Sequence, residues 1–198
     1  MNLRYAIRDR RHTHLLKAAR RGDEKAFRRL YDELYVPLAG YLVRRVNIPQ
    51  DAEDLISTVF HRFLQNLEKY DPDRGSVQSW VLTMARHALI DHLRKSRETQ
   101  PIENLAEVLA GPLNTPLDGL IRTEEADRVR ELVRTLPPET REMISLRYGQ
   151  GLRHREIGNL LGLNEAAVKQ RISRALQELR RRANKKTMTG GEVDFATR

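Results

Sequence analysis

The chain has 198 residues and a net charge of +9, from 36 Lys and Arg against 27 Asp and Glu. This excess of basic residues indicates either an anionic partner, such as nucleic acid or a membrane surface, or a role in solubility alone. It has no cysteine, which excludes disulfides, thiolate zinc sites and cysteine nucleophiles. No stretch approaches the roughly 18 apolar residues of a membrane span, and the N-terminal residues lack the apolar core of a signal peptide, so we expect a cytoplasmic protein.

The charge is uneven along the chain. Residues 1–97 have a net charge of +7 and residues 122–198 of +6, whereas residues 98–121 contain four acidic and no basic side chains, with three prolines and two glycines. This composition is typical of a linker that resists regular structure, apart from one short helix at 102–109. We therefore predict two small helical domains, a flexible acidic linker between them and a disordered tail, with bounds 1–97, 98–121, 122–182 and 183–198.

Helical periodicity is the main signal before the linker. Asp23 is a predicted N-cap, and apolar side chains follow it at helical spacing. These side chains are Phe27, Leu30, Tyr31 and Leu34. A second helix is predicted near 37–46, and the sequence NIPQ ends it. No segment shows a sustained alternation of period two, so we expect no strands and an all-α fold.

Two further helices are predicted in this part, on either side of a loop. Asp51 opens the first of them, and Asp54 three residues later gives a carboxylate variant of the capping box. Its apolar stripe consists of Leu55, Val59 and Phe63, or, for a wider face, of Ile56, Phe60, Phe63 and Leu64. The loop YDPDRGS is rich in turn-forming residues. The helix after this loop has one apolar face, formed by Leu82, Ala85, Leu89 and Leu93.

The C-terminal part predicts a helix-turn-helix. A helix at 139–148, with proline at its start and glycine after its end, precedes the motif. The first helix of the motif runs over 153–161. Gly162 then stands where a left-handed residue ends a helix, Leu163 is a buried turn residue, and Asn164 caps the next helix. The predicted core side chains are Ile157, Leu160, Leu161, Val168, Ile172, Ala175, Leu176 and Leu179.

The second helix of this motif leaves polar side chains on its outer faces, namely Lys169, Gln170, Arg171, Ser173 and Arg174. A recognition helix enters the major groove with its N-terminal residues against base edges. Long basic and amide side chains there pair with bases and phosphates. The alternative is a helical hairpin with a solvated charged face. The spacing favours DNA binding.

The sequence gives little support to other chemistry. None of the six histidines has the i, i+4 spacing of a helical metal site, and HExxH is absent. The GQG sequence lacks the third glycine of a dinucleotide loop, and no P-loop sequence occurs. No pair of carboxylates is marked as catalytic. We therefore predict no cofactor, no metal and no enzymatic activity.

Four motifs follow one another in a distinctive order. They are RGDEKAFRRLYDELY at 21–35, DAEDLISTVFHRFL at 51–64, YDPDRGSVQSWVLTMARHALIDHLRKSR at 70–97 and LPPETREMISLRYGQGLRHREIGNLLGLNEAAVKQRISRALQEL at 136–179. Over residues 13–182 this order, with the linker after the third motif, resembles the extracytoplasmic-function (ECF) branch of the sigma-70 family. The resemblance implies a bacterial initiation factor that binds core RNA polymerase, directs it to promoters through their −10 and −35 elements, and melts the promoter.

The second motif resembles the helix that docks on the clamp helices of the largest polymerase subunit, and the flap region of the polymerase is the other implied contact. The resemblance assigns polymerase binding to Asp51, Glu53, Asp54, Ser57 and Thr58. An acidic first turn that only complements the helix dipole is the alternative, and both can hold. The family usually has Gln and Glu where Ser57 and Thr58 stand, and Trp where Leu64 stands.

The third motif resembles the element that captures the −10 region as single-stranded DNA. A pocket for a flipped base, with basic side chains along the backbone, would stabilise the unpaired strand. The residues implied are Asp71, Asp73, Arg74, Ser76 and Ser79 in the loop, and Arg86, His87, Ile90, Asp91 and Arg94 on the helix. The family usually has Asn where His87 stands. Trp80 is either a stacking platform or a core residue.

The fourth motif resembles the reader of the −35 element. The residues implied are Arg153, Arg155, Asn164, Glu165, Ala166, Lys169, Gln170, Arg171 and Arg174. The family usually has Thr near the start of the recognition helix, where this chain has Ala167. This change removes a hydroxyl group that could contact a phosphate.

The remaining expectations concern partners and alternatives. The acidic linker resembles the segment that threads through the polymerase, although an ordinary solvated tether has the same composition. Family members are often held inactive by an anti-sigma protein. A helix-turn-helix regulator is a competing hypothesis, but it has no use for a loop and basic helix suited to unpaired bases. An enzyme acting on nucleic acid would need a carboxylate cluster or a nucleophile in basic surroundings, which the sequence does not show.

Overall fold

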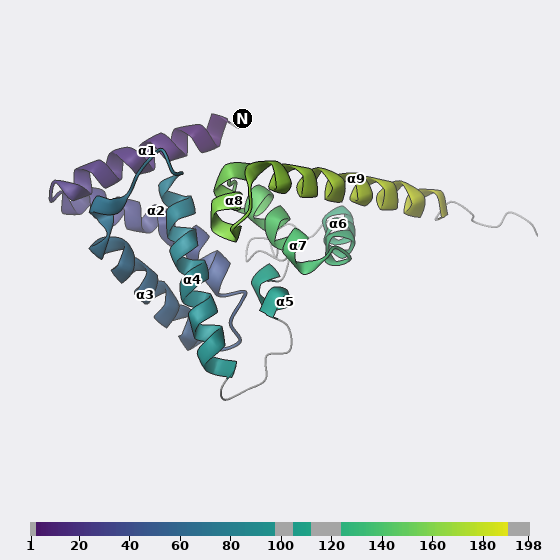
Figure 1. Cartoon of the computed structure of the whole chain (residues 1–198), viewed down its shortest axis with the longest axis horizontal. Coiled ribbons are helices and arrows are strands. Elements are labelled where there is room, and N and C mark those ends of the chain that lie inside the picture. The colour runs from purple at the N-terminus through teal and green to yellow at the C-terminus, as the bar shows by residue number, and fades with distance from the viewer. Residues whose placement is uncertain (1–2, 98–104, 112–123, 190–198) are drawn as a thin grey trace, which may run out of the picture.

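A computed structural model describes residues 3–97, 105–111 and 124–189, and within them the chain is helical, without strands. None of the helices in these ranges is both long and apolar enough to cross a membrane. The helices are α1 (Leu3–Arg20), α2 (Glu24–Leu42), α3 (Pro49–Gln65), η1 (Leu67–Lys69), α4 (Val77–Arg97), α5 (Leu105–Ala110), α6 (Glu124–Arg134), α7 (Pro138–Ile144), η3 (Ser145–Gly149), α8 (His154–Leu161) and α9 (Glu165–Thr189) (Figure 1).

The N-terminal bundle consists of α1 to α4. Asp23 caps α2 as predicted, because its carboxylate accepts a hydrogen bond from the Ala26 N–H at 3.0 Å. The separate helix predicted near 37–46 is wrong, since α2 continues to Leu42 with Pro37 inside it. The apolar stripe explains the continuation: buried side chains follow at helical spacing on both sides of the proline, and their packing outweighs its cost. They are Leu30, Leu34, Leu38, Tyr41 and Leu42.

The start of α3 also differs from the prediction. The helix begins at Pro49, a residue type well suited to the first helical position, and Ile48 precedes it without a side-chain cap. Asp51 and Asp54 therefore lie within the helix and form no capping box. The predicted core stripe of α3 is buried, as is that of α4 after the loop, whereas Leu64 of the wider face is exposed. Helix α1 was not predicted, because its buried side chains are few among many charged ones.

The C-terminal bundle contains the predicted helix-turn-helix, formed by α8 and α9. Gly162 ends α8 in the left-handed region with φ of 71°, and Asn164 caps α9 by accepting a hydrogen bond from the Ala167 N–H at 2.7 Å. The core side chains predicted for both helices are buried or half-buried. Leu163 is half-buried, less than predicted, because it lies at the edge of the turn. Before the motif, the helix predicted at 139–148 continues from α7 into a π-helical turn.

The linker contains a helix that packs on both bundles. The short helix predicted at 102–109 corresponds to α5, although residues 102–104 and the rest of the linker outside 105–111 lie beyond the described residues. Helix α5 packs against α7, and Arg45, in the turn after α2, donates hydrogen bonds to the carbonyls of Leu109 at 2.8 Å and Ala110 at 3.4 Å. Helix α9 continues past the predicted start of the tail, to Thr189, and residues 190–198 are outside the described ranges.

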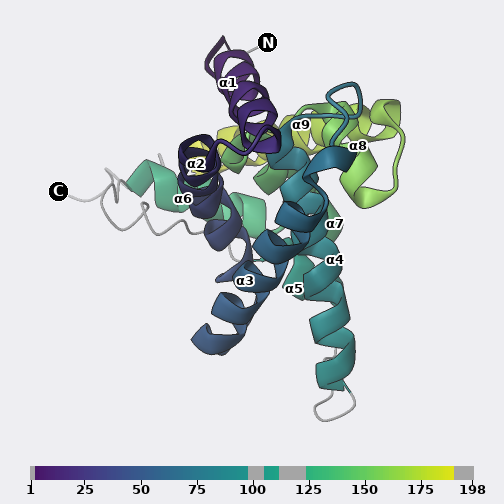
Figure 2. The ribbon, with the colours of Figure 1, turned by 90° about the vertical axis from the view of Figure 1, so that its left-hand side faces the viewer.

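The two bundles contact each other directly. Helix α8 lies beside the N-terminal end of α4, as the two perpendicular views agree (Figures 1 and 2). Buried apolar side chains from both bundles belong to one cluster, which runs from Leu15 to Ala175. Helix α9 projects away from this contact over much of its length (Figure 1). The contact therefore brings the predicted −10 loop and the helix-turn-helix to the same place.

Candidate functional site

The loop between η1 and α4 has a defined shape. The hydroxyl of Tyr70 donates a hydrogen bond to the Gly75 carbonyl at 3.0 Å, which closes the loop. The Asp71 carboxylate accepts one from the Asp73 N–H at 2.9 Å. At the start of α4, the Ser79 N–H donates to the Ser76 hydroxyl oxygen at 3.2 Å. These local bonds fix the shape of the loop, which lies beside the start of α4.

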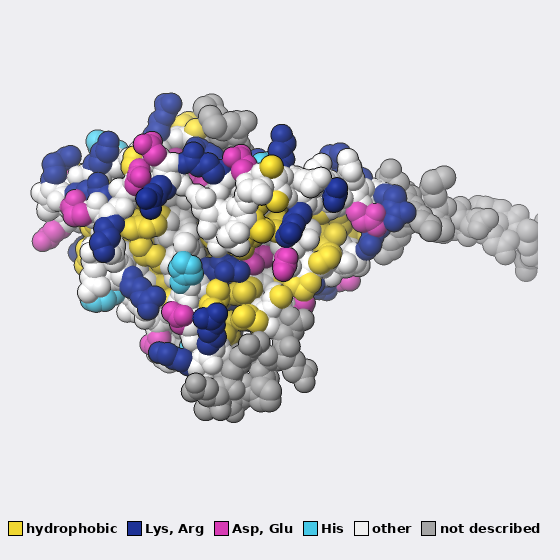
Figure 3. Space-filling view, in the orientation of Figure 1, with side chains coloured by type: hydrophobic (Ala, Val, Ile, Leu, Met, Phe, Trp, Pro, Cys, Tyr) yellow, Lys and Arg dark blue, Asp and Glu magenta, His cyan; other side chains and the backbone are white. Residues whose placement is uncertain are grey.

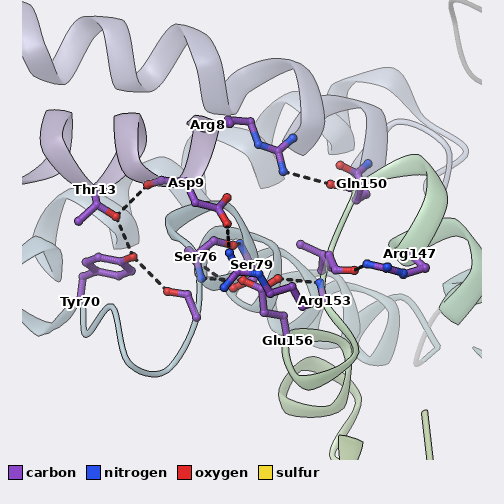
Figure 4. A network of polar contacts seen from close by, with 12 residues as sticks. Arg8, Asp9, Thr13, Tyr70, Ser76, Ser79, Arg147, Gln150, Arg153 and Glu156 are labelled. Carbon is purple, nitrogen blue, oxygen red and sulfur yellow. Dashed lines mark hydrogen bonds and ion pairs between the residues drawn. The ribbon is translucent and has the colours of Figure 1, made fainter. Parts of the chain in front are cut away.

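Helix α1 supports this loop from behind. Its last residue, Arg20, donates hydrogen bonds from its guanidinium to the carbonyls of Leu67, at 2.9 Å, and Tyr70, at 2.8 Å. The Thr13 hydroxyl lies 3.4 Å from the Tyr70 hydroxyl (Figure 4). The sequence did not indicate these residues, since they belong to a helix that was not predicted.

A pocket of about 470 Å³ lies between the loop and the first two turns of α4. Trp80 lines it while contacting the rings of Phe63 and Tyr70, each with its centroid 5.5 Å away. Trp80 is thus a half-buried side chain that is both part of the packing and part of the pocket wall. The other lining residues from this bundle are Lys69, Tyr70, Asp71, Arg74, Gly75, Ser79 and Thr83.

The residues assigned to −10 DNA fall into two groups. In the loop, Asp73 and Arg74 are exposed and Asp71 is half-buried, whereas Ser76 and Ser79 are buried and bonded to each other. Three of these five line the pocket. Along α4, further from the pocket, the side chains of His87, Asp91 and Arg94 are exposed and those of Arg86 and Ile90 are half-buried.

The C-terminal bundle completes the pocket. Glu156 and Asn159, both on α8, line it together with the loop residues. The carboxylate of Glu156 accepts hydrogen bonds from the N–H groups of Ser76, at 2.7 Å, and Arg153, at 2.8 Å (Figure 4). Sequence reasoning missed both residues, because no local pattern indicates a contact with a loop about 80 residues away.

The residues assigned to polymerase binding lie on two sides of α3. Glu53 and Ser57 line a groove of about 400 Å³ between α3 and α2, beside exposed apolar and aromatic side chains that include Tyr35 and Leu64. The others face α4, in a smaller pocket of about 220 Å³; they are Asp51, Asp54 and Thr58. Asp51 lies there 3.4 Å from the His92 ring. One helix thus presents acidic side chains to two different grooves.

The residues assigned to the −35 element lie mostly on one accessible surface. The exposed ones at the start of α9 are Glu165, Ala166, Lys169, Gln170, Arg171 and Arg174, and the capping residue Asn164 is exposed with them. Arg171 lies 3.4 Å from the Glu139 carboxylate. On α8, Arg155 is exposed and Arg153 forms an ion pair with Asp9 of α1 at 2.9 Å. Only Arg153 among these residues is engaged with the N-terminal bundle.

Two carboxyl groups at the contact between the bundles have shifted pKa values. Burial raises the pKa of Glu142, and the nearby Arg86 and Arg45 oppose this shift without cancelling it. Burial acts on Glu156 in the same sense, but its hydrogen bonds with Arg153 and Ser76 outweigh burial, so that its pKa lies below the ordinary value. Glu156 is therefore an anion at neutral pH, held against the rim of the pocket.

Basic side chains are spread over one face of the molecule. Figure 3 shows Lys and Arg side chains over both bundles, interspersed with acidic ones, on the face that it presents. Across the described part of the chain, no three His, Asp or Glu side chains gather in a way that could hold a metal ion. Such a surface suits contacts with an extended polyanion more than one small charged ligand.

Family models and curated proteins match the chain. The model of Sigma-70 region 2 matches residues 30–99, and that of Sigma-70, region 4 matches residues 126–179. The chain is 32% identical over 172 residues to the ECF RNA polymerase sigma factor BldN of Streptomyces coelicolor, covering 84% of this chain and 64% of BldN. It is 31% identical over 160 residues to the ECF RNA polymerase sigma factor RpoE of Cereibacter sphaeroides, covering 80% of this chain and 86% of that protein.

Two solved structures have a similar fold. CnrH, solved in complex with the cytosolic domain of CnrY, superimposes with a TM-score of 0.57 at 24% identity, covering 88% of this chain and 97% of the other. The sigma factor RpoE of Bartonella quintana, solved with the anti-sigma factor NepR, gives a TM-score of 0.54 at 18% identity, covering 79% of this chain and 96% of the other. These similarities concern the fold alone.

Proposed function

This chain belongs to the ECF branch of the sigma-70 family, and we propose that three of its surfaces have separate functions when it starts transcription at specific promoters with RNA polymerase. Helix α3 binds the core polymerase. The loop at 70–79 and the exposed side of α4 hold the unpaired −10 strand. The outward side of α9 reads the −35 element. No catalytic residue is needed for this function, since the polymerase supplies the chemistry.

The observation that carries the proposal is the pocket beside the loop. Its volume of about 470 Å³ falls in the range of sites that bind small organic groups. An aromatic wall, Trp80, and a polar rim that includes Arg74 and Ser79 offer stacking and hydrogen bonds to an extruded base. The exposed His87 and Arg94 continue from the pocket along α4, where the backbone of the same strand would run.

Promoter melting by the holoenzyme tests this assignment. Replacing His87 and Arg94 together by alanine should reduce permanganate reactivity of the −10 thymines, because the unpaired strand loses contacts with its bases and phosphates. Removal of one contact to a single-stranded base costs about 1–3 kcal/mol, so the opened fraction should fall several-fold. Arg28→Ala, which removes an exposed charge from α2, is the control. Unchanged melting and an unchanged start site in the double variant would contradict the assignment.

An anti-sigma protein is the other partner that we propose. The family resemblance supports it, and RpoE of Bartonella quintana was solved with such a protein. The groove between α2 and α3 offers it a surface, since the exposed Tyr35 and Leu64 line this groove together, and apolar side chains gathered in a groove are a common feature of binding sites. The polymerase would compete for the same helix, α3.

A further inference from the structure

The positive charge of the N-terminal bundle is concentrated at the start of the chain. Residues 1–22 contain seven Lys and Arg and one acidic residue, Asp9, whereas residues 23–97 contain twelve basic and eleven acidic residues. Most of the surplus of positive charge therefore belongs to α1 and the turn after it. None of the three surfaces proposed above includes this segment.

Four side chains of this segment form one exposed line, which we call the α1 line. It consists of Arg10, His14, Lys17 and Arg21, which are all exposed. They follow one another at spacings of four, three and four residues, which place them on one side of a helix. The opposite side of α1 packs into the bundle through buried leucines. Figure 1 shows α1 along the outer edge of the N-terminal bundle, where the α1 line is accessible.

The cations of the α1 line are not neutralised by the residues described around them. Elsewhere on this helix, Arg11 pairs with Glu33. Within the described part of the chain, in contrast, Arg10, Lys17 and Arg21 form no ion pair. A row of cations without acidic neighbours creates a local positive potential that attracts an anionic partner.

The chemistry of the α1 line fits a phosphate backbone better than other partners. Ile7 is the only exposed apolar residue among the α1 side chains that the structure describes. A protein partner is usually bound through an apolar or aromatic centre, an unpaired strand through aromatic stacking, and a membrane surface through an exposed apolar face. Duplex DNA presents one phosphate charge per about 1.7 Å of its axis, so cations spread over about 16 Å of helix would each meet a phosphate.

The α1 line begins beside the −10 loop. Arg20, the last residue of α1, donates hydrogen bonds to the carbonyls of Leu67, at 2.9 Å, and Tyr70, at 2.8 Å, at the start of the loop. The next residue, Arg21, is the end of the α1 line. DNA whose unpaired strand is held at the loop therefore has its flanking duplex within reach of α1.

We propose that the α1 line binds the phosphates of the duplex that flanks the unpaired −10 strand, without reading its sequence. The proposal rests on the function assigned to the loop. Contacts of this kind fix the position of a protein on DNA and carry no sequence information. The α1 line would thus hold the duplex while the loop and α4 hold the unpaired strand.

Binding of promoter DNA by the holoenzyme, measured at several salt concentrations, tests the proposal. Two probes share one −10 sequence: a single-stranded oligonucleotide, and a fragment with duplex on both sides of an unpaired −10 segment. The variant Arg10→Ala/Lys17→Ala/Arg21→Ala should bind the flanked fragment more weakly. It should also lower the slope of log affinity against log salt concentration by about three, about one for each phosphate contact. Its affinity for the single strand should equal that of the wild type.

A matched control removes the same charge elsewhere. The variant Arg134→Ala/Arg180→Ala/Arg181→Ala changes exposed positions on α6 and α9. Two of these cations are already paired within the chain, Arg134 with Glu131 and Arg181 with Glu178. This control should therefore keep the affinity and the salt slope of the wild type.

A conservative variant separates charge from shape. Arg10→Lys/Arg21→Lys should bind the flanked fragment as the wild type does, because a phosphate contact needs a positive charge and lysine supplies one. Circular dichroism checks that the helices persist in every variant. If the triple alanine variant unfolds, Arg10→Ala alone replaces it and should lower the salt slope by about one.

The outcomes separate this proposal from the assignment of the loop. A wild-type salt slope of the triple alanine variant on the flanked fragment overturns the duplex contact. Equal weakening on the single strand overturns it as well, because α1 would then act through the loop. A loss of affinity for the core polymerase, with DNA binding unchanged, would assign the α1 line to an acidic protein surface instead. The loop assignment fails separately, if His87→Ala/Arg94→Ala binds the single strand as the wild type does.

Discussion

A single carboxylate, that of Glu156, satisfies the starts of two helices. Its two oxygens accept the N–H groups of Ser76, just before α4, and of Arg153, just before α8. The second bond is half of a capping box: the carboxylate at the third helical position accepts the N–H of the residue before the helix, and Arg153, whose guanidinium only donates, does not return it. The first bond joins two bundles, so neither its existence nor its importance follows from any local pattern.

Buried His12 should make the stability of the N-terminal bundle depend on pH. Its side chain is 1% exposed, and burial lowers its pKa from the ordinary value of 6.5, with Glu33 acting in the opposite sense. The unfolded chain then binds the proton more tightly, so stability is lost as the pH falls below 6.5. Thermal unfolding followed from neutral to mildly acidic pH should show that His12→Leu removes part of this loss.

His14 is the matched control for this measurement, because it is exposed on the same helix. His14→Leu should leave the pH dependence of the melting temperature as it is in the wild type. If the melting temperatures of both leucine variants depend on pH to the same extent, the buried imidazole does not contribute.

Two glycines of the helix-turn-helix should differ in their tolerance of alanine. A Cβ at Gly158 would lie 2.5 Å from the Leu163 carbonyl oxygen, whereas at Gly162 it would meet open space but stand in the left-handed region. Gly162→Ala should therefore cost about 1–2 kcal/mol of stability, and Gly158→Ala should cost more because the turn must move. Denaturant unfolding of both variants measures the order, and a smaller loss for Gly158→Ala would contradict it.

At the scale of the helix, periodicity and caps predicted most of the elements. Asp23, Gly162 and Asn164 act as their residue types suggest, because caps depend on neighbours within one turn. The errors came where packing overrides local signals. Pro37 indicated a break that the buried stripe of α2 bridges, and α1 has too few apolar side chains to be recognised without the bundle that it covers.

The two sides of α3 lead to a prediction about polymerase binding. Glu53 faces the groove with α2 and Asp54 the pocket with α4, so a polymerase that docks on one side contacts only one of them. Glu53→Lys and Asp54→Lys, measured separately, should differ in affinity for the core polymerase by about tenfold, since a repelled charge at the contact costs on the order of 1.4 kcal/mol. Asp32→Lys on α2 is the control, and wild-type affinity in both α3 variants would reject α3 as the docking helix.

Different residues of α9 should contact the bases and the phosphates of the −35 element. Glu165, Ala166 and Lys169 are nearest its N-terminus, so their substitution should change which −35 sequence is preferred, by about 1–3 kcal/mol for each base contact. Alanine at Arg171 or Arg174 should weaken binding to all sequences. It should also lower, by about one, the slope of log affinity against log salt concentration. Holoenzyme binding to single-base −35 variants at several salt concentrations distinguishes the two. If substitution of Arg174 changes the preferred −35 sequence and substitution of Lys169 does not, the helix docks in another register.

At the scale of the whole molecule, the sequence predicted two helical bundles but not their contact. The loop residues of the candidate site were predicted from the family resemblance. The residues that complete or support the pocket, Glu156, Asn159 and Arg20, come from segments distant in the chain, and their approach depends on how the bundles pack. No residue type or spacing indicates such an approach.

The polar contacts between the two bundles should respond to salt in solution. The pair of Asp9 and Arg153 is partly exposed, and at about 1 M salt the screening length falls to about 3 Å. Because the chain has no cysteine, fluorophores can be attached at Glu24→Cys and Arg180→Cys, both at exposed positions on opposite bundles. Energy transfer between them should decrease at high salt. In Asp9→Ala/Asn159→Ala, which loses the pair with Arg153 and the bond to the Arg74 carbonyl, it should already be low at low salt. Equal transfer under all these conditions would contradict a contribution of these polar contacts to holding the bundles together.

Because both helical bundles belong to one chain, dilution cannot separate them. A tethered surface is present at a millimolar effective concentration whatever the abundance of the protein. A separate protein partner, in contrast, must be made in proportion to its target. The fraction of chains whose bundles are in contact is therefore set by the contacts between the bundles, and it does not change with the abundance of the protein.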